Sequence, residues 1–234
     1  TLGRNVPDVM RRAFSQLRNG RGGPVLIEVP GDVFREEVAD DFVYVPSTKS
    51  RTAPDPADVQ RAAEVLAGAE NPVIYAGQGV HFGKAWEELK SLAETWNIPV
   101  TTSLEGKSAF PEDHPLSLGS GGRSLPRAVH EFLQDADVIF GIGCSFALTG
   151  FGVQMPKGKT IIHATLDPMD LNKDVPVQHT MTGDSQLTLS MLDEAMAGLD
   201  KSKATARAGV SKQIAATKES WLNDWMPILT NNDA

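Results

Sequence analysis

Short apolar runs alternate with longer amphipathic stretches along the central part of this chain. The runs have the length of buried strands, and the stretches between them place apolar residues at helical spacing. The predicted strands are residues 72–76, 99–102, 137–142 and 160–164, and the predicted helices are residues 58–69, 84–96, 125–134 and 184–197. Strands that alternate with helices form parallel βαβ units with right-handed crossovers. The pattern therefore predicts an α/β fold with a doubly wound, Rossmann-like parallel sheet of about six strands.

The two ends of the chain follow other patterns. Residues 7–19 have helical spacing, and the apolar run PVLIEVP at 24–30 is predicted to be a buried strand. Residues 31–56 are acidic and then rich in Pro and Ser, which favours a linker. Residues 200–213 are polar, and we predict a mobile connection there. The segment WLNDWMPIL at 221–229 carries two tryptophans, which we expect to pack on another part of the protein.

Composition and charge narrow the class of partner. The 234 residues carry a formal net charge of −8 without a basic stripe, so we expect no nucleic-acid partner. No apolar run approaches the ~20 residues that cross a bilayer, and the first residues lack the apolar centre of a signal peptide. The single cysteine, Cys144, excludes an internal disulfide. We therefore expect a cytoplasmic protein with no membrane partner.

Most isolated polar residues carry no catalytic pattern. The five histidines lack zinc-binding spacing, and no G-x-S-x-G elbow is present, so we assign no metal ligand and no catalytic residue. Cys144 has no C-x-x-C partner and is interpreted as a small packing residue. Lys107 is the best-placed cation for an anionic ligand, although an ordinary surface lysine fits its position equally well.

Glycine-containing loops follow two of the predicted strands. Gly77-Gln78-Gly79 follows the strand at 72–76, and Gly143 follows the strand at 137–142. Open α/β sheets bind ligands at the carboxyl ends of their strands, where backbone N–H groups can face a phosphate. Phe82 stands where the third glycine of G-x-G-x-x-G would fall, so the dinucleotide fingerprint is incomplete. A tight turn without a ligand and a nucleotide-contacting loop both remain open.

Two segments are more specific than a generic βαβ unit. They are TTSLEGKSAFPEDHPLSLG at 101–119 and TIIHATLDP at 160–168. With them, the chain resembles thiamine-diphosphate enzymes of the acetolactate synthase type, over nearly its whole length. In this alignment, 1–30 resembles the end of the pyrimidine-binding domain, 31–54 a linker, 55–198 the central domain, and 199–234 the connector toward the pyrophosphate-binding domain. The chain begins with Thr, and we expect it to be a segment of a longer protein.

The resemblance implies that the catalytic parts lie outside this chain. The family's cofactor-activating glutamate belongs to the pyrimidine-binding domain, and its Mg²⁺ and diphosphate site is a GDG…NN motif in the third domain. No GDG occurs here. The implied parent is a thiamine-diphosphate-dependent lyase or transferase, a homodimer or homotetramer at full length, that acts on a small 2-oxo acid. The segment alone is predicted to be inactive, and its Lys107–Pro111 loop to line the access route.

The resemblance also suggests a cofactor for this domain, because the central domain of acetolactate synthases holds FAD. The candidate cofactor-binding residues are Gly77, Gln78, Gly79, Leu104, Gly106, Gly143, Asp167 and Asp184. Three places depart from the flavin enzymes: Ser120-Gly121-Gly122 replaces Met-His-Gly, Ser145 replaces an arginine, and Thr165 replaces an aspartate. These changes remove a charge-assisted partner for the pyrophosphate and an acceptor for the adenosine end.

Two other classes of protein compete with this interpretation. The first is a stand-alone module that binds FAD, ADP or a CoA-like adenine nucleotide. The helix–strand pair at 1–30 and the linker argue against it, because an independent module would not need them. The second is an NAD-dependent, sirtuin-like protein, which the incomplete glycine fingerprint and the lack of zinc-binding cysteines disfavour.

Overall fold

The computed structural model describes residues 2–39, 42–46 and 48–231, and the chain divides into two compact units, Thr1–Thr52 and Ala53–Ala234. The first unit contains a 3₁₀ turn at Gly3–Asn5, helix α1 at Val6–Arg18 and a second 3₁₀ turn at Val33–Arg35. Among its described residues, the buried hydrophobic side chains are Ala13 and Val33. The predicted helix at 7–19 is therefore confirmed, but it has little core around it.

The predicted strand at 24–30 is wrong. These residues form no strand in the described part of the chain, and the side chain of Leu26 is 93% exposed. A strand needs a neighbouring strand to satisfy its backbone N–H and C=O groups, and the described residues of this unit supply none. The apolar run alone therefore could not form a sheet.

The second unit is built on six parallel strands in the order β3-β2-β1-β4-β5-β6. The strands are β1 Pro72–Ala76, β2 Val100–Thr102, β3 Ser117–Ser120, β4 Val138–Ile142, β5 Thr160–Thr165 and β6 His179–Thr182. The chain moves outward from β1 to β3, crosses to β4, and then moves outward in the other direction to β6. This is the doubly wound parallel sheet that the sequence predicts.

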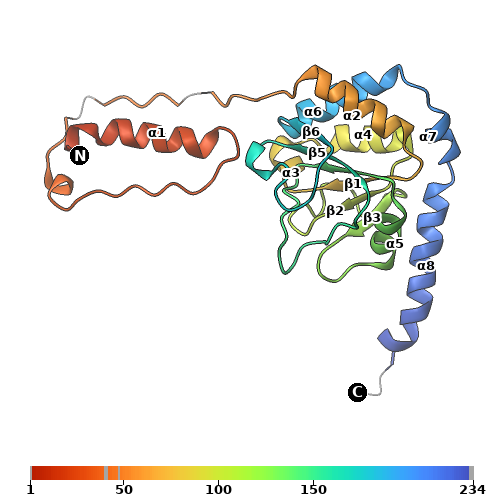
Figure 1. Ribbon diagram of the computed structural model, residues 1–234. Helices are drawn as coiled ribbons and strands as arrows, with labels where there is room; N and C mark the ends of the chain where they lie inside the picture. Colours follow the sequence, from red (N-terminus) through yellow and green to blue (C-terminus); the bar gives the residue numbers. More distant parts are fainter. Residues whose placement is uncertain (1, 40–41, 47, 232–234) are drawn as a thin grey trace. The chain divides into compact units, whose positions relative to one another are not determined.

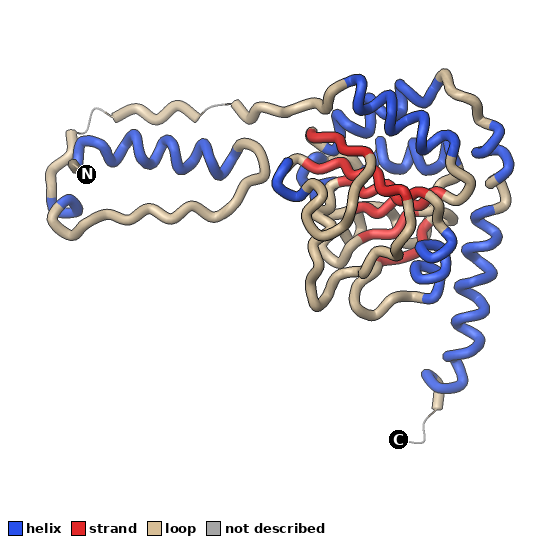
Figure 2. Tube along the Cα trace, in the orientation of Figure 1, coloured by secondary structure: helices blue, strands red, loops and turns tan. Residues whose placement is uncertain are grey.

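Helices cover both faces of this sheet (Figure 1). They are α2 Pro56–Gly68, α3 Gly79–Gly83, α4 Trp86–Trp96, α5 Arg127–Asp135, α6 Ser185–Ala197, α7 Ser202–Ala206 and α8 Val210–Leu229. Helices α2 and α4 both pack against α6 over one face. Helix α5 lies beside β3 and α8 on the other side, where much of the remaining cover is loop (Figure 2). The core lies between these layers and includes Trp96, Phe140 and Leu89, each fully buried.

Residues 200–213, predicted to be a mobile connection, instead form α7 and the start of α8. Ala204, Val210 and Ile214 are buried against the core. The Arg207 guanidinium donates to the carbonyl oxygens of Ala69 at 2.6 Å and Trp96 at 3.0 Å. The buried positions recur at helical spacing, but the polar residues between them hide the pattern in the sequence.

The segment 221–229 forms the second half of α8. Asp224 pairs with Arg127 of α5 at 2.7 Å, while the large apolar side chains of the segment remain exposed. Its expected packing on another part of the protein stays a prediction. Within the described ranges, no helix is long and apolar enough to span a bilayer.

Candidate functional site at the carboxyl edge of the sheet

All the candidate cofactor-binding residues lie after the carboxyl ends of strands in the same sheet. Gly77-Gln78-Gly79 follows β1, Leu104 and Gly106 follow β2, Gly143 follows β4, Asp167 follows β5, and Asp184 follows β6. Strands β1 and β4 are neighbours whose following connections run in opposite directions. This is the topological switch point, where open α/β sheets bind ligands. The structure therefore brings the predicted residues to one edge.

The glycine N–H groups at the switch point are already bonded within the chain. The N–H of Gly77 donates to the carbonyl oxygen of Ile142 at 2.9 Å, and that of Gly79 donates to Gly143 at 2.8 Å. The N–H of Gly143 in turn donates to Ala164 at 2.8 Å. These bonds continue the ladders between β1, β4 and β5 past the ends of the strands. The loops thus act as an extension of the sheet.

Close backbone contacts explain why these positions are glycine. A Cβ atom at Gly79 would lie 2.6 Å from the Cα of Gly143, and one at Gly77 would lie 2.4 Å from the Gly143 carbonyl oxygen. A Cβ at Gly106 would lie 2.5 Å from the carbonyl oxygen of Ala76. Gly143 also has a φ of +63°, which L side chains rarely adopt. The tight-turn interpretation thus accounts for the glycines without any ligand.

The two aspartates cap helices. Asp184 is buried, and its Oδ1 accepts from the N–H groups of Gln186 at 3.0 Å and Leu187 at 3.3 Å, at the start of α6. The Oδ1 of Asp167 accepts from the Met169 N–H at 3.0 Å, at the short 3₁₀ turn Pro168–Asp170. Both arrangements are N-caps, which satisfy donors that the first helical turn would otherwise leave unpaired.

Leu104 covers the small residues that follow β3. Its side chain is 49% exposed, and a Cβ at Gly122 would lie 2.9 Å from its Cδ1 atom. The N–H of Gly121 donates to the Thr102 carbonyl oxygen at 2.8 Å. The Ser120-Gly121-Gly122 segment, where the chain departs from the flavin enzymes, therefore leaves the room that Leu104 fills.

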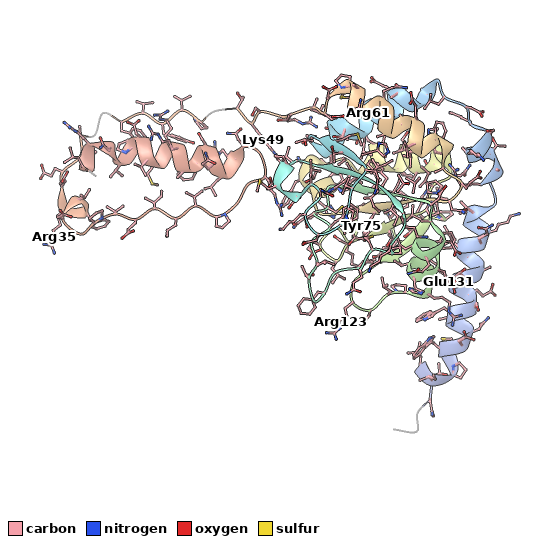
Figure 3. The ribbon with its side chains drawn as sticks, in the orientation of Figure 1. Arg35, Lys49, Arg61, Tyr75, Arg123 and Glu131 are labelled. Carbon is pink, nitrogen blue, oxygen red and sulfur yellow. The ribbon has the colours of Figure 1, made fainter. Side chains whose placement is uncertain are left out.

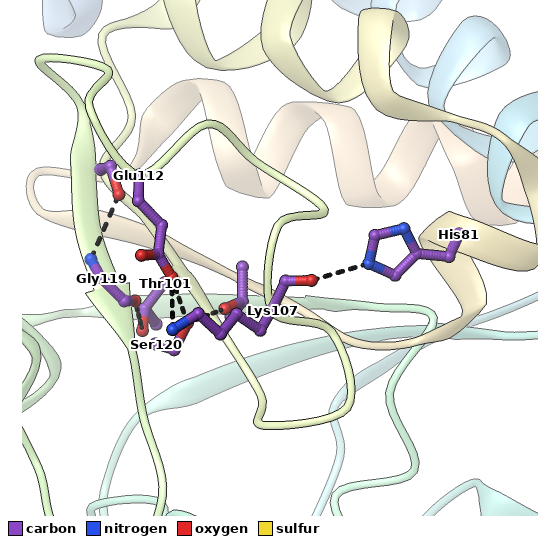
Figure 4. A network of polar contacts seen from close by, with 8 residues as sticks. His81, Thr101, Lys107, Glu112, Gly119 and Ser120 are labelled. Atoms are coloured by element: carbon purple, nitrogen blue, oxygen red, sulfur yellow. Dashed lines mark hydrogen bonds and ion pairs between the residues drawn. The ribbon is translucent and has the colours of Figure 1, made fainter.

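A polar network holds the loop between β2 and β3 (Figure 4). The Lys107 ammonium lies 3.7 Å from the carboxylate of Glu112, which accepts from the Ser120 hydroxyl at 2.9 Å. The Ser120 hydroxyl oxygen accepts from Thr102 at 2.9 Å. The Lys107–Glu112 pair is largely exposed and is worth at most about 1 kcal/mol, because solvent screens it. The best-placed cation of the sequence thus has a carboxylate partner.

His81 ties this loop to α3. One ring nitrogen, Nδ1, accepts from the Trp86 indole N–H at 3.0 Å, and Nε2 lies 2.9 Å from the Lys107 carbonyl oxygen. A carbonyl oxygen can only accept, so the hydrogen-bond network assigns the neutral tautomer with its proton on Nε2. This tether could not be predicted from the sequence, because Trp86 starts α4 and Lys107 lies in the loop between β2 and β3, well after His81 in the chain.

A buried aromatic cluster lies beneath the loop after β4. The ring of Phe146 stacks on Tyr75 with centroids 5.6 Å apart and meets the edge of His163 at 4.8 Å. Figure 3 shows Tyr75 inside the unit. Burial raises the pKa of Tyr75 well above its usual range and that of Cys144 to about 12. Cys144 stays a protonated thiol near neutral pH, in agreement with its interpretation as a packing residue.

His163 gives the fold a predictable response to acid. Its Nε2 lies 2.8 Å from the Cys144 carbonyl oxygen, and its buried Nδ1 has no partner within the described part of the chain. Burial lowers the pKa of His163 below its usual value near 6.5. In the window between the two values the unfolded state binds more protons, so the free energy of unfolding falls as the pH drops from about 6.5.

Denaturation at pH 7.5 and at pH 5.5 measures this effect. The His163→Gln variant keeps an N–H donor for the Cys144 carbonyl but does not titrate, so its stability should depend less on pH than that of the wild type. Both proteins share every other titrating group, so the difference between their slopes isolates His163. Equal slopes would show that His163 does not couple protonation to folding.

Two further features lie outside this edge. A cavity of about 420 Å³ opens at the amino ends of β1 and β2, beside α5 and α8, and is lined in part by Pro72, Phe132 and Arg207. It contains none of the predicted site residues. Among the described residues, no group of three His, Cys, Asp or Glu side chains is placed to hold a metal ion.

The doubly wound sheet and its glycine-lined switch point define a Rossmann-like α/β domain. The family described as thiamine pyrophosphate enzyme, central domain, matches residues 59–192, more than half of the chain. The chain belongs to this family. The resemblance noted from the two sequence segments is thereby confirmed.

The chain is also similar to individual known proteins. It is 38% identical, over 209 residues, to a probable acetolactate synthase large subunit of Methanocaldococcus jannaschii, covering 86% of this chain and 35% of that protein. It is 33% identical to glyoxylate carboligase of Escherichia coli O157:H7, covering 84% of this chain and 34% of that one. The benzoylformate decarboxylase of Polynucleobacter necessarius shares the fold with a TM-score of 0.72 and 26% identity, over 87% of this chain and 39% of that chain. The chain spans about a third of the length of the curated relatives it matches.

Proposed function

We propose that this chain is the central domain of a thiamine-diphosphate-dependent 2-oxo acid decarboxylase or carboligase of the acetolactate synthase type. The match of residues 59–192 to the central-domain family is the observation that carries the proposal. The relatives named acetolactate synthase and glyoxylate carboligase support the carboligase class. By this proposal residues 1–30, 31–54 and 199–234 lead into neighbouring domains of a longer enzyme.

The domain's part in the reaction is architectural. When bound to its own site, thiamine diphosphate supplies the nucleophilic carbon and the electron sink for decarboxylation of the 2-oxo acid. The residues at the carboxyl edge form a rigid surface and supply no reacting group. The glycine loops are hydrogen-bonded to one another, and contacts from His81 and Glu112 hold the loop that contains Lys107. We propose that the Lys107–Pro111 loop lines the route to the active site.

The rest of the proposal concerns the whole enzyme. Thiamine diphosphate and Mg²⁺ would bind to domains outside this chain, and the full-length protein would be a cytoplasmic homodimer or homotetramer. The M. jannaschii relative is named a large subunit, which is consistent with further subunits or domains. No observation at the sheet edge favours the alternative of a stand-alone FAD or ADP module.

The experiment is an assay of the purified chain with pyruvate, thiamine diphosphate and Mg²⁺. We expect no pyruvate consumption, because the sequence contains no GDG motif to hold the metal and diphosphate. The control is the same assay with a full-length acetolactate synthase. Turnover by the chain alone would refute its assignment as a non-catalytic domain.

A further inference from the structure

The sequence left open whether the switch point binds a dinucleotide, and its hydrogen bonds provide a test. A pyrophosphate at the end of a strand needs backbone N–H donors at the start of the next helix, or a cation beside it. An adenosine ribose needs an acceptor for its hydroxyl groups. Each of these three requirements can be compared with the residues at the carboxyl edge.

The backbone donors are committed to other groups. The N–H groups of Gly79, Val80, His81 and Phe82, which begin α3, donate to carbonyl oxygens of Gly143, Gly77, Gln78 and Gln78, in that order, at 2.8–3.2 Å. Since Gly77 donates to Ile142 as well, the Gln78 N–H is the remaining backbone donor of the loop. One neutral donor is a poor match for a pyrophosphate with two charged groups.

No cation replaces these donors. Ser145 stands where the flavin enzymes have an arginine, and its hydroxyl oxygen accepts from the Ala147 N–H at 3.3 Å. The Lys107 ammonium faces the Glu112 carboxylate. Arg123 is exposed, and its side chain extends outward from the loop, as Figure 3 shows. The described residues at this edge thus lack a buried positive charge aimed at a bound phosphate.

The carboxylates and the glycine loops at this edge already make contacts within the chain. Asp167 and Asp184 each use Oδ1 to accept from backbone N–H groups as helix caps, so these two oxygens already hold the starts of their helices. The Gly79 N–H donates to the Gly143 carbonyl oxygen at 2.8 Å, so a ligand cannot lie between the two loops without breaking this bond. The site residues present do not fit FAD or a related dinucleotide.

We infer that the strand-end cleft of this domain is sealed by backbone contacts and does not bind FAD, ADP or another adenine nucleotide. The switch-point glycines allow the loops after β1 and β4 to pack closely together, and they do not form a cofactor site. The inference goes beyond the proposed function and does not rest on it, because a domain that bound FAD would still belong to the same family. A negative result for the inference would therefore leave the proposed function unaffected, and the reverse also holds.

The experiment uses the purified protein, both as this chain and as the longest product of its gene. Flavin is sought in the absorption spectrum and in the supernatant after acid denaturation, and FAD, ADP and inorganic pyrophosphate are titrated by calorimetry. We expect no released flavin and no saturable binding up to about 1 mM ligand, the range of a weak interaction. A flavin-containing protein purified in parallel is the positive control.

Released flavin, or saturable FAD or ADP binding in either protein, would overturn the inference. Binding of pyrophosphate alone to this chain would overturn it too, because it would show that the loop offers a phosphate site. The longer product is titrated with saturating thiamine diphosphate and Mg²⁺ present, so that its diphosphate site in another domain is already occupied. Absence of binding in both proteins supports it, and testing the longer product excludes the possibility that flanking residues complete the site.

Discussion

Replacing Gly79 with alanine is expected to lower the free energy of unfolding of the second unit by about 3 kcal/mol. The new Cβ would lie 2.6 Å from the Cα of Gly143, and the neighbouring atoms are backbone that cannot rotate away. The loops after β1 and β4 would have to separate, which would break the bond from the Gly79 N–H to the Gly143 carbonyl oxygen. Urea denaturation followed by circular dichroism measures the loss.

Gly68 provides a matched control. It is exposed at the end of α2, and a Cβ there would meet nothing within 4 Å. Gly68→Ala should change stability by at most about 1 kcal/mol, with the helix propensity of alanine in its favour. If Gly79→Ala proved as mild as Gly68→Ala, the two loops could move apart easily, and the sealed cleft would lose its main support.

Replacing Arg207 with alanine is expected to cost about 3 kcal/mol. Its guanidinium donates to Ala69, which caps the end of α2, and to Trp96, the last residue of α4. Both carbonyls come at helix ends, where no intrahelical donor is left for them. Burial lowers the pKa of Arg207, although its two hydrogen bonds are made by the charged form.

Two further variants test this role. Arg207→Lys keeps a positive charge but cannot donate to both carbonyls in the same planar geometry, so an intermediate loss of stability is expected. Lys212→Ala, at an exposed position of α8, should stay within about 0.5 kcal/mol of the wild type. If Arg207→Ala matched Lys212→Ala, α7 would not hold the ends of α2 and α4 together.

Strands β1 and β4 could be predicted from the sequence because each is a continuous apolar run, and β2 and β5 because a short run with apolar residues lies between helical patterns. Strands β3 and β6 cannot be predicted in the same way because they are short and polar, with the sequences SLGS and HTMT. Both lie at the edges of the sheet, where one side of the strand needs no partner and apolar character is weaker. The run at 24–30 is apolar and yet forms no strand. Among the described residues of the first unit, there is no neighbouring strand with which it could pair.

The position of the candidate site in the fold could be predicted from the sequence, but the availability of its hydrogen-bonding groups to a ligand could not. Glycines and aspartates after strands indicated the carboxyl edge, and the structure gathers them there. Whether the Gly79 N–H is available to a ligand depends on Gly143, which is distant in the sequence and is set beside it by the register of β1 and β4. The tether from His81 to Lys107 and the stacking of Phe146 on Tyr75 likewise depend on tertiary contacts.

The most direct measurement of the proposed role is a calorimetric titration of the purified chain with thiamine diphosphate in the presence of Mg²⁺. A central domain without the family's GDG motif should give no saturable binding, while a full-length acetolactate synthase titrated in parallel should bind. Saturable binding of thiamine diphosphate to this chain alone would contradict the assignment of its cofactor site to other domains.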